Sequence, residues 1–175
     1  PYTSAELNAL FSSPLFTGCR SDEAPHEPGN HRITEHRYWL PLVALFSGAR
    51  LGEIAQLLVA DLKELDGQWV IDITTDGSEE KSLKARGSRR VVPLHSELVK
   101  LGFLNYRQQM ETRGHNRLFP EVVPDTRGFL SGNPSRWYGR YLKRIGHKQD
   151  GAVNFNAMRH GLFDALRRAG YQNDE

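Results

Sequence analysis

The stretch Ser47-Gly48-Ala49-Arg50-Leu51-Gly52-Glu53-Ile54-Ala55-Gln56-Leu57-Leu58-Val59-Ala60-Asp61 predicts a glycine turn that leads into an amphipathic helix. Its apolar residues follow the i, i+3, i+4, i+7 spacing of a core-facing helix at Leu51, Ile54, Ala55 and Leu58. Arg50 stands at the start of that helix, where exposed backbone N–H groups and the helix dipole favour an anion. Glu53 is one turn further on, so it can hold the guanidinium as an i, i+3 pair. The stretch predicts either a phosphate-binding arginine or an ordinary surface Arg–Glu pair.

Length and composition limit the class of protein. The chain has 175 residues, of which 38% are hydrophobic, and this predicts one domain. A single cysteine, Cys19, excludes an intramolecular disulfide and a multi-cysteine zinc site, as is typical of the reducing cytoplasm. The sequence has no run of membrane-spanning length and no signal-peptide pattern at its start. We therefore expect a cytoplasmic protein without a membrane partner.

Charge is distributed unevenly, although the net charge is only +2. Seven acidic residues and one lysine lie within 61–80, whereas five basic residues and no acid lie within 81–95. The segment 136–168 carries eight basic residues against two acidic ones. Segregated basic blocks of this kind favour a polyanion partner. The alternative is a charged face that only contacts solvent.

The pattern along the chain predicts a mainly α fold with a small antiparallel β-sheet (α+β). Thr3 and Glu6 indicate a capping box before a first short helix, and a loop is expected over 12–30. Strands are expected over 69–74 and 91–94, with Asp66-Gly67 as a hairpin turn. The expected longer helices cover 33–46, with a kink or break at Pro41, and then 96–110, 133–145 and 155–169, the last ending at Gly170 as C′ cap.

Two sets of basic side chains are candidates for DNA contact. A lysine on the turn between the two strands can reach a backbone phosphate or a leaving oxygen, with Lys84 the better placed and Lys81 the reserve. The helix over 133–145 alternates basic and aromatic residues, which predicts an aromatic face packed inward and a basic face toward solvent or DNA. The predicted DNA-binding residues are Lys81, Arg86, Arg89, Arg90, Arg136, Arg140, Lys143 and Arg144.

No metal or cofactor is expected from the sequence. His26, His31 and His36 lie near one another in the chain, but their irregular spacing does not match a metal-ligand set, so we interpret them as surface residues.

Three motifs in order resemble the catalytic domain of tyrosine recombinases, the phage integrase family. The first is Ser-Gly-x-Arg-x-x-Glu-Ile-x-x-Leu around Arg50, and the second is the stretch 84–94, which ends in Ser-Arg-Arg-Val-Val-Pro-Leu. The third is Phe-Asn-x-x-Arg-His around Arg159. The resemblance covers residues 34–170. It implies a site-specific recombinase that binds double-stranded DNA and cleaves and rejoins its strands through a 3′-phosphotyrosine without metal or nucleotide. It also implies that Arg50 and Arg159 hold the phosphate oxygens and that Lys84 protonates the leaving 5′-oxygen. Glu53, Asp61 and His160 would be supporting residues.

The chain departs from the family pattern in two ways. Asn156 occupies the usual histidine position, and an asparagine donates hydrogen bonds but exchanges no proton near neutral pH. The nucleophilic tyrosine of the family lies beyond the point where this sequence stops, so no nucleophile is expected within residues 1–175. We accordingly expect a single, C-terminally truncated catalytic domain without the N-terminal DNA-clamping domain. The full-length protein, bacterial or phage-encoded, would self-associate on DNA, and this fragment is expected to be a monomer.

Two other functions remain open at this point. A non-catalytic DNA-binding module derived from the same family would fit Asn156. A metal-dependent nuclease shares the substrate, but it needs a carboxylate cluster that does not accompany the arginines.

Overall fold

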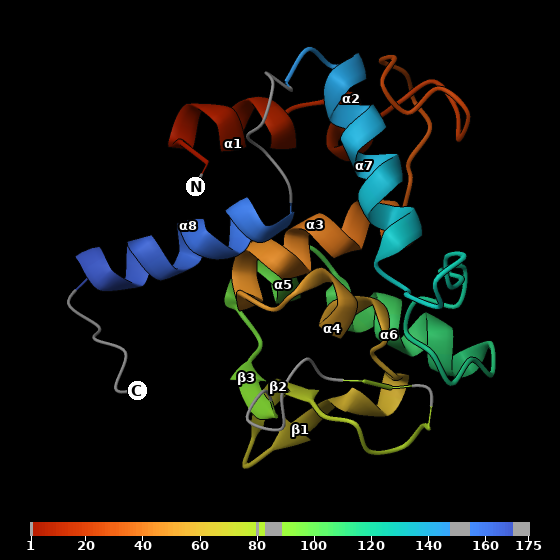
Figure 1. Ribbon diagram of the computed structural model, residues 1–175, viewed down its shortest axis with the longest axis vertical. Coiled ribbons are helices and arrows are strands. Elements are labelled where there is room, and N and C mark those ends of the chain that lie inside the picture. The colour runs from red at the N-terminus through yellow and green to blue at the C-terminus, as the bar shows by residue number, and fades with distance from the viewer. Residues whose placement is uncertain (1, 80, 83–88, 148–154, 170–175) are drawn as a thin grey trace.

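The computed structural model describes residues 2–79, 81, 82, 89–147 and 155–169, and only the backbone of 163–168 (Figure 1). Helix α1 (Ser4–Phe11) begins with the predicted capping box, in which Glu6 N donates to Thr3 Oγ1 and Thr3 N donates to Glu6 Oε2. The region 12–30 is not loop alone, because it contains the short helix α2 (Pro14–Thr17). Cys19 also forms isolated β-bridges there, with Pro28 and His31.

Helix α3 (His36–Ser47) runs through the centre of the molecule and buries Trp39, Leu40 and Val43 (Figure 1). It begins later than expected because Glu35 is its N-cap, with the side chain accepting a hydrogen bond from Arg37 N. The helix continues through Pro41 without a break. It ends at Gly48, whose left-handed φ of 63° makes the predicted turn toward Arg50.

Helix α4 (Leu51–Ala55) is shorter than its apolar pattern predicts. The chain leaves the helix at Gln56, and a 3-10 helix, η1 (Val59–Asp61), follows in place of further α-helical turns. Leu58 is therefore outside the helix and only half-buried, whereas Leu57 is in the core. A five-residue helix has little dipole, so the anion affinity expected at Arg50 rests on its guanidinium alone.

The sheet is a three-stranded antiparallel meander of β1 (Leu62–Leu65), β2 (Gln68–Ile73) and β3 (Arg90–Pro93). The predicted turn at Asp66-Gly67 joins β1 to β2, and both residues have positive φ. Strand β3 is an edge strand, as its proline predicts, with Ile73 opposite Arg90. This register places Arg90 at the start of the strand.

The single helix expected over 96–110 is instead two helices, α5 (Ser96–Lys100) and α6 (Phe103–Thr112). Gly102 separates them because its φ of 93° is a left-handed conformation that no α-helix contains. Leu118 and Phe119 are fully buried and belong to the core. The Tyr106 hydroxyl donates to Leu118 O at 2.8 Å and fixes this segment against α6.

Helix α7 (Gly132–Arg144) has the predicted division of faces, with Tyr138, Tyr141 and Leu142 buried. The Tyr141 hydroxyl lies 2.6 Å from Ser13 Oγ and ties α7 to the N-terminal helices. Helix α8 (Phe155–Arg168) packs beside α3 (Figure 1). The expected cap at Gly170 lies outside the described residues.

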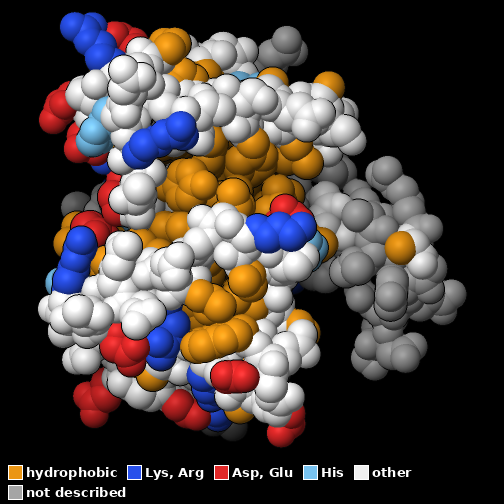
Figure 2. Space-filling view, turned by 180° about the vertical axis from the view of Figure 1, so that it is seen from behind, with side chains coloured by type: hydrophobic (Ala, Val, Ile, Leu, Met, Phe, Trp, Pro, Cys, Tyr) orange, Lys and Arg blue, Asp and Glu red, His pale blue; other side chains and the backbone are white. Residues whose placement is uncertain are grey.

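The architecture is therefore mixed, with helices around a central α3 and a small antiparallel sheet at one end (Figure 1). None of the helices in the described part of the chain is long and apolar enough to cross a bilayer. Figure 2 shows the molecule from behind, where hydrophobic side chains occupy the middle of the surface and the Lys and Arg side chains are scattered.

Candidate functional site

A cavity of about 570 Å³ lies between α4, the segment 127–131 and the first residues of α7 and α8. We call it the arginine cavity. Its polar lining residues are Arg50, Glu53, Ser82, Arg127, Ser131, Ser135, Arg136 and Asn156. The fold thus brings residues from four separate parts of the sequence to one place, among them the predicted site residues Arg50, Glu53, Arg136 and Asn156.

Arg50 is the N-cap of α4, and Glu53 binds it twice. Arg50 N donates to Glu53 Oε2 at 2.8 Å, and Arg50 Nη1 donates to Glu53 Oε1 at 3.1 Å. The Arg50 side chain remains 37% exposed, whereas Glu53 is 5% exposed. The carboxylate therefore lies behind the guanidinium and orients it from the protein side, as the sequence predicts for this pair.

Arg90 from β3 binds the same carboxylate. Its Nη2 donates to Glu53 Oε2 at 2.8 Å and its Nη1 donates to Oε1 at 3.3 Å. Burial alone raises the pKa of Glu53, but the hydrogen bonds from Arg90 and Arg50 outweigh burial and hold the pKa below its ordinary value. One ionised glutamate thus joins two arginines, which leaves a net positive charge.

Arg159 on α8 belongs to this cluster. The pKa of its guanidinium is lowered from the ordinary value, first by burial and then by the positive charge of Arg50, while Glu53 acts in the opposite direction and Arg90 adds to the lowering. The charges of Arg50, Glu53 and Arg90 therefore all act on Arg159, which brings the arginines of two motif segments into one cluster with Arg90 as a third. Of the three arginines, only Arg50 is among the described residues that line the arginine cavity.

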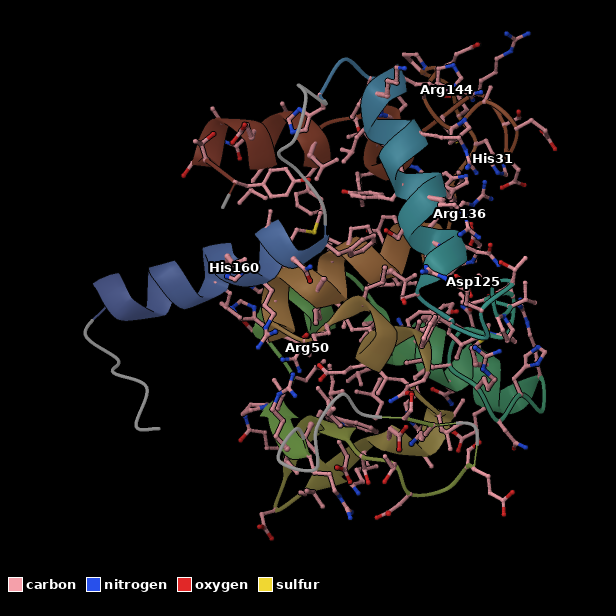
Figure 3. All side chains as sticks on the ribbon, viewed as in Figure 1. His31, Arg50, Asp125, Arg136, Arg144 and His160 are labelled. Atoms are coloured by element: carbon pink, nitrogen blue, oxygen red, sulfur yellow. The ribbon has the colours of Figure 1, made fainter. Side chains whose placement is uncertain are left out.

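The other predicted residues on α8 are both exposed. Asn156 lines the arginine cavity, where its carboxamide can donate a hydrogen bond to a bound anion. His160 is one turn further along the helix and is absent from the cavity wall. Figure 3 shows that Arg50 and His160 lie on different elements. His160 is on α8 and lies away from the loop that holds Asp125.

The sequence predicts that Lys81 reaches outward, but in the structure its side chain is buried. Its Nζ lies 2.6 Å from Asp61 Oδ2, and the two side chains are only 2% and 7% exposed. Lys81 Nζ also donates to Asp76 O at 2.9 Å. A buried ammonium that is fully engaged inside the protein has no surface to offer DNA, so its role here is to hold Asp61 against the end of the sheet. Lys84 and Arg86 lie outside the described residues.

The remaining basic candidates differ in their surroundings. Arg89 is exposed but pairs with Asp76 at 2.5 Å. On α7, all four basic side chains are exposed, as predicted, and Arg136 alone among them lines the arginine cavity. Arg140 and Arg144 line a separate hollow of about 220 Å³, and Lys143 is exposed on the same helix.

Arg127 and Asp125 are the site residues that sequence reasoning missed. Arg127 lines the cavity from the loop before α7, and Asp125 lies next to its guanidinium. The signal in the sequence is Asp125-Thr126-Arg127-Gly128. This is a turn pattern, because the aspartate side chain can accept hydrogen bonds from backbone N–H groups of the residues that follow it. That pattern predicts the turn, but it does not predict where Arg127 points.

A larger cavity of about 950 Å³ lies between the segments 56–60 and 77–78, with Lys81, on one side and α6 with the segment 114–120 on the other, yet its Lys and Arg side chains are engaged within the protein. Arg107 donates to Leu62 O, Arg117 donates to Val122 O, and Lys81 is paired with Asp61. Within the described part of the chain, no group of three or more His, Cys, Asp or Glu residues is arranged to hold a metal ion. The arginine cavity is the better candidate for an anion because Arg50 and Arg136 turn donor groups toward it.

Comparisons with known proteins give no relative: no protein-family model matches the chain, and neither a curated protein nor a solved structure does.

Proposed function

We propose that this chain is part of the catalytic domain of a tyrosine-type site-specific DNA recombinase, with the arginine cavity as the place where a DNA phosphate binds. The observation that supports the proposal is that residues from three motif segments, far apart in the sequence, interact with one another. Arg50 from α4, Arg90 from β3 and Arg159 from α8 interact as one cationic cluster, and Asn156 opens into the adjoining cavity.

This arrangement suits phosphoryl transfer. Cleavage of a DNA strand concentrates negative charge on the non-bridging oxygens of a five-coordinate phosphorus, and guanidinium groups fixed in advance stabilise that charge. Glu53 supplies the fixing, because it holds Arg50 and Arg90 from the buried side. The nucleophilic tyrosine and Lys84 would complete the chemistry in the full-length protein.

The first test is the salt dependence of duplex DNA binding by the 175-residue chain, measured by fluorescence anisotropy. Each phosphate contact contributes about 0.9 to the slope of log K against log salt. Arg50→Ala and Arg159→Ala should each reduce the slope by about that amount. Arg113→Ala, at an exposed arginine on the end of α6, is the matched control and should leave the slope unchanged. A slope that is indifferent to Arg50 and Arg159 would place the DNA elsewhere.

A non-catalytic DNA-binding module is the second candidate, and Asn156 favours it. The described residues that line the cavity include no histidine, and the Asn156 carboxamide donates hydrogen bonds but exchanges no proton near neutral pH. A nicked suicide duplex separates the two functions in the full-length protein. A recombinase leaves a covalent protein–DNA adduct that disappears in Arg50→Ala, whereas a binding module retains affinity and leaves no adduct.

A further inference from the structure

The loop before α7 is folded around the carboxylate of Asp125. Asp125 Oδ1 accepts hydrogen bonds from Arg127 N and Phe129 N, both at 2.9 Å, and the side chain has no exposed surface. These backbone hydrogen bonds, with that from Phe129 the strongest cause, hold the pKa of Asp125 below its ordinary value, so the carboxylate is charged at neutral pH. We call Asp125 the anchor carboxylate.

The other oxygen of the anchor carboxylate faces two guanidinium groups. Asp125 Oδ2 accepts no hydrogen bond among the described residues, but Arg127 Nη2 lies 3.7 Å from it and Arg136 Nη1 lies 3.8 Å from it. Gly132 allows this approach, because a Cβ at that position would come within 2.0 Å of Oδ2. Two like charges are thus gathered over one buried negative charge, and the rim keeps a net positive charge.

Each of the two arginines has a further support that directs it. Arg136 Nη2 donates to Asn133 Oδ1 at 2.5 Å, and the Arg127 guanidinium lies 5.7 Å from the ring centroid of Phe129. Both side chains nevertheless remain more than half exposed, at 74% for Arg127 and 52% for Arg136. Their outer N–H groups are therefore accessible to a ligand in the cavity that they line.

The arginine cavity is larger than one phosphate requires. Its volume of about 570 Å³ compares with the ~30 Å³ that a water occupies in the liquid, and a phosphate has only five heavy atoms. Arg50 lines the cavity from the start of α4, while Arg127 and Arg136 line it from the loop and α7. A DNA strand carries a phosphate at every nucleotide, so one strand can present more than one phosphate to the cavity.

From this geometry we infer that Arg127 and Arg136, held by Asp125, form a second phosphate subsite that binds a backbone phosphate other than the one at Arg50. The inference rests on the proposed function, because it assumes that the cavity receives DNA. It assigns Asp125 as a positioning residue and Arg127 as a DNA contact.

The test compares variants in the same salt titration on one duplex. The double variant Arg127→Ala/Arg136→Ala should lose about 0.9 of the slope, the value for one phosphate, on a background where Arg50 still contributes its own share. If the double variant matches the wild type while Arg50→Ala still lowers the slope, the second subsite is refuted and the proposed function stands. If Arg50→Ala and the double variant both leave the slope unchanged, the DNA does not enter the cavity and both ideas fail.

Asp125→Asn tests the positioning role separately, because asparagine keeps an oxygen for the two backbone N–H groups but removes the charge. If Asp125 gathers the arginines, the asparagine variant should lose the same slope as the double variant. A steeper slope or tighter binding would instead mean that Asp125 only neutralises the rim, and this result would overturn its assignment. Circular dichroism of each variant checks that the chain remains folded.

Discussion

Substituting Glu53 by glutamine should destabilise the protein in a way that depends on pH. Glu53 accepts four hydrogen bonds, one from Arg50 N and three from the guanidinium groups of Arg50 and Arg90. Glutamine keeps one acceptor oxygen but presents an NH₂ group to donors in place of the other. Hydrogen bonds to charged groups are worth about 1.5–3 kcal/mol each, and removing one partner of a buried ion pair costs about 3–5 kcal/mol.

The cost here lies below that range because the side chains of Arg50 and Arg90 are about one third exposed and regain hydration. We therefore expect Glu53→Gln to lower the free energy of unfolding by about 2 kcal/mol at pH 7. For a domain of this size that corresponds to a fall in Tm of roughly 4–8 °C. Glu64→Gln, at an exposed glutamate of β1, is the matched control and should change the free energy of unfolding by less than about 0.5 kcal/mol.

The pH dependence follows from the lowered pKa of Glu53. A carboxyl whose pKa is lower in the folded than in the unfolded state contributes stability that is fully present above the unfolded pKa, about 4.3. That contribution is lost as the pH falls through the folded pKa. Urea denaturation at pH 7, 5 and 3.5 should show an equal difference between wild type and Glu53→Gln at the two higher values and a smaller one at pH 3.5. An equal difference at all three values would refute the reasoning.

Three further predictions concern stability, each measured by urea denaturation at pH 7. Gly132→Ala should lower the free energy of unfolding by about 1–3 kcal/mol, because the new Cβ would clash with the anchor carboxylate. Gly139→Ala, in open space on the same helix, is the control and should raise the free energy of unfolding by about 0.5–1 kcal/mol. Equal effects of the two substitutions would contradict this packing. Tyr141→Phe should cost about 1–2 kcal/mol, since its hydroxyl binds two groups in the α1–α2 region, and an unchanged midpoint would argue against these bonds. Lys81→Met should cost about 3–5 kcal/mol by leaving Asp61 buried as an unpaired charge, and adding Asp61→Asn should restore most of the loss. A double variant as unstable as the single one would show that charge is not the cause.

Local interactions were predictable from the sequence because their partners lie within a few residues. The capping box at Thr3, the Asp66-Gly67 turn and the pairing of Arg50 with Glu53 each join groups that are at most three positions apart. The basic face of α7 is also local, since the helical period alone separates Arg140 from Tyr141. In each case propensity and side-chain reach point to the same structure.

Long-range partners were not predictable in this way. Arg90 finds Glu53 across 37 positions of sequence, and neither residue's neighbours indicate that pairing. Lys81 and Arg89 belong to the same basic segment, yet one is buried against Asp61 and the other is exposed. The early end of α4 has a similar cause, since the backbone that follows it pairs with a distant segment: Val59 N donates to Asn116 O, and Leu118 N donates to Leu57 O. Tertiary contacts override local pattern at these points.

The two walls of the arginine cavity share one electrostatic arrangement. On the α4 side, Glu53 binds Arg50, which lines the cavity, and Arg90, which is not among the described lining residues; on the α7 side, Asp125 lies behind Arg127 and Arg136. Each side therefore carries two positive charges and one buried negative charge, so each keeps a net positive charge. An anion in contact with the guanidinium groups is attracted to them more strongly than the more distant carboxylates repel it, because the Coulomb energy falls with distance. The net charge of +2 for the whole chain thus understates the field at the cavity, because position rather than number decides it.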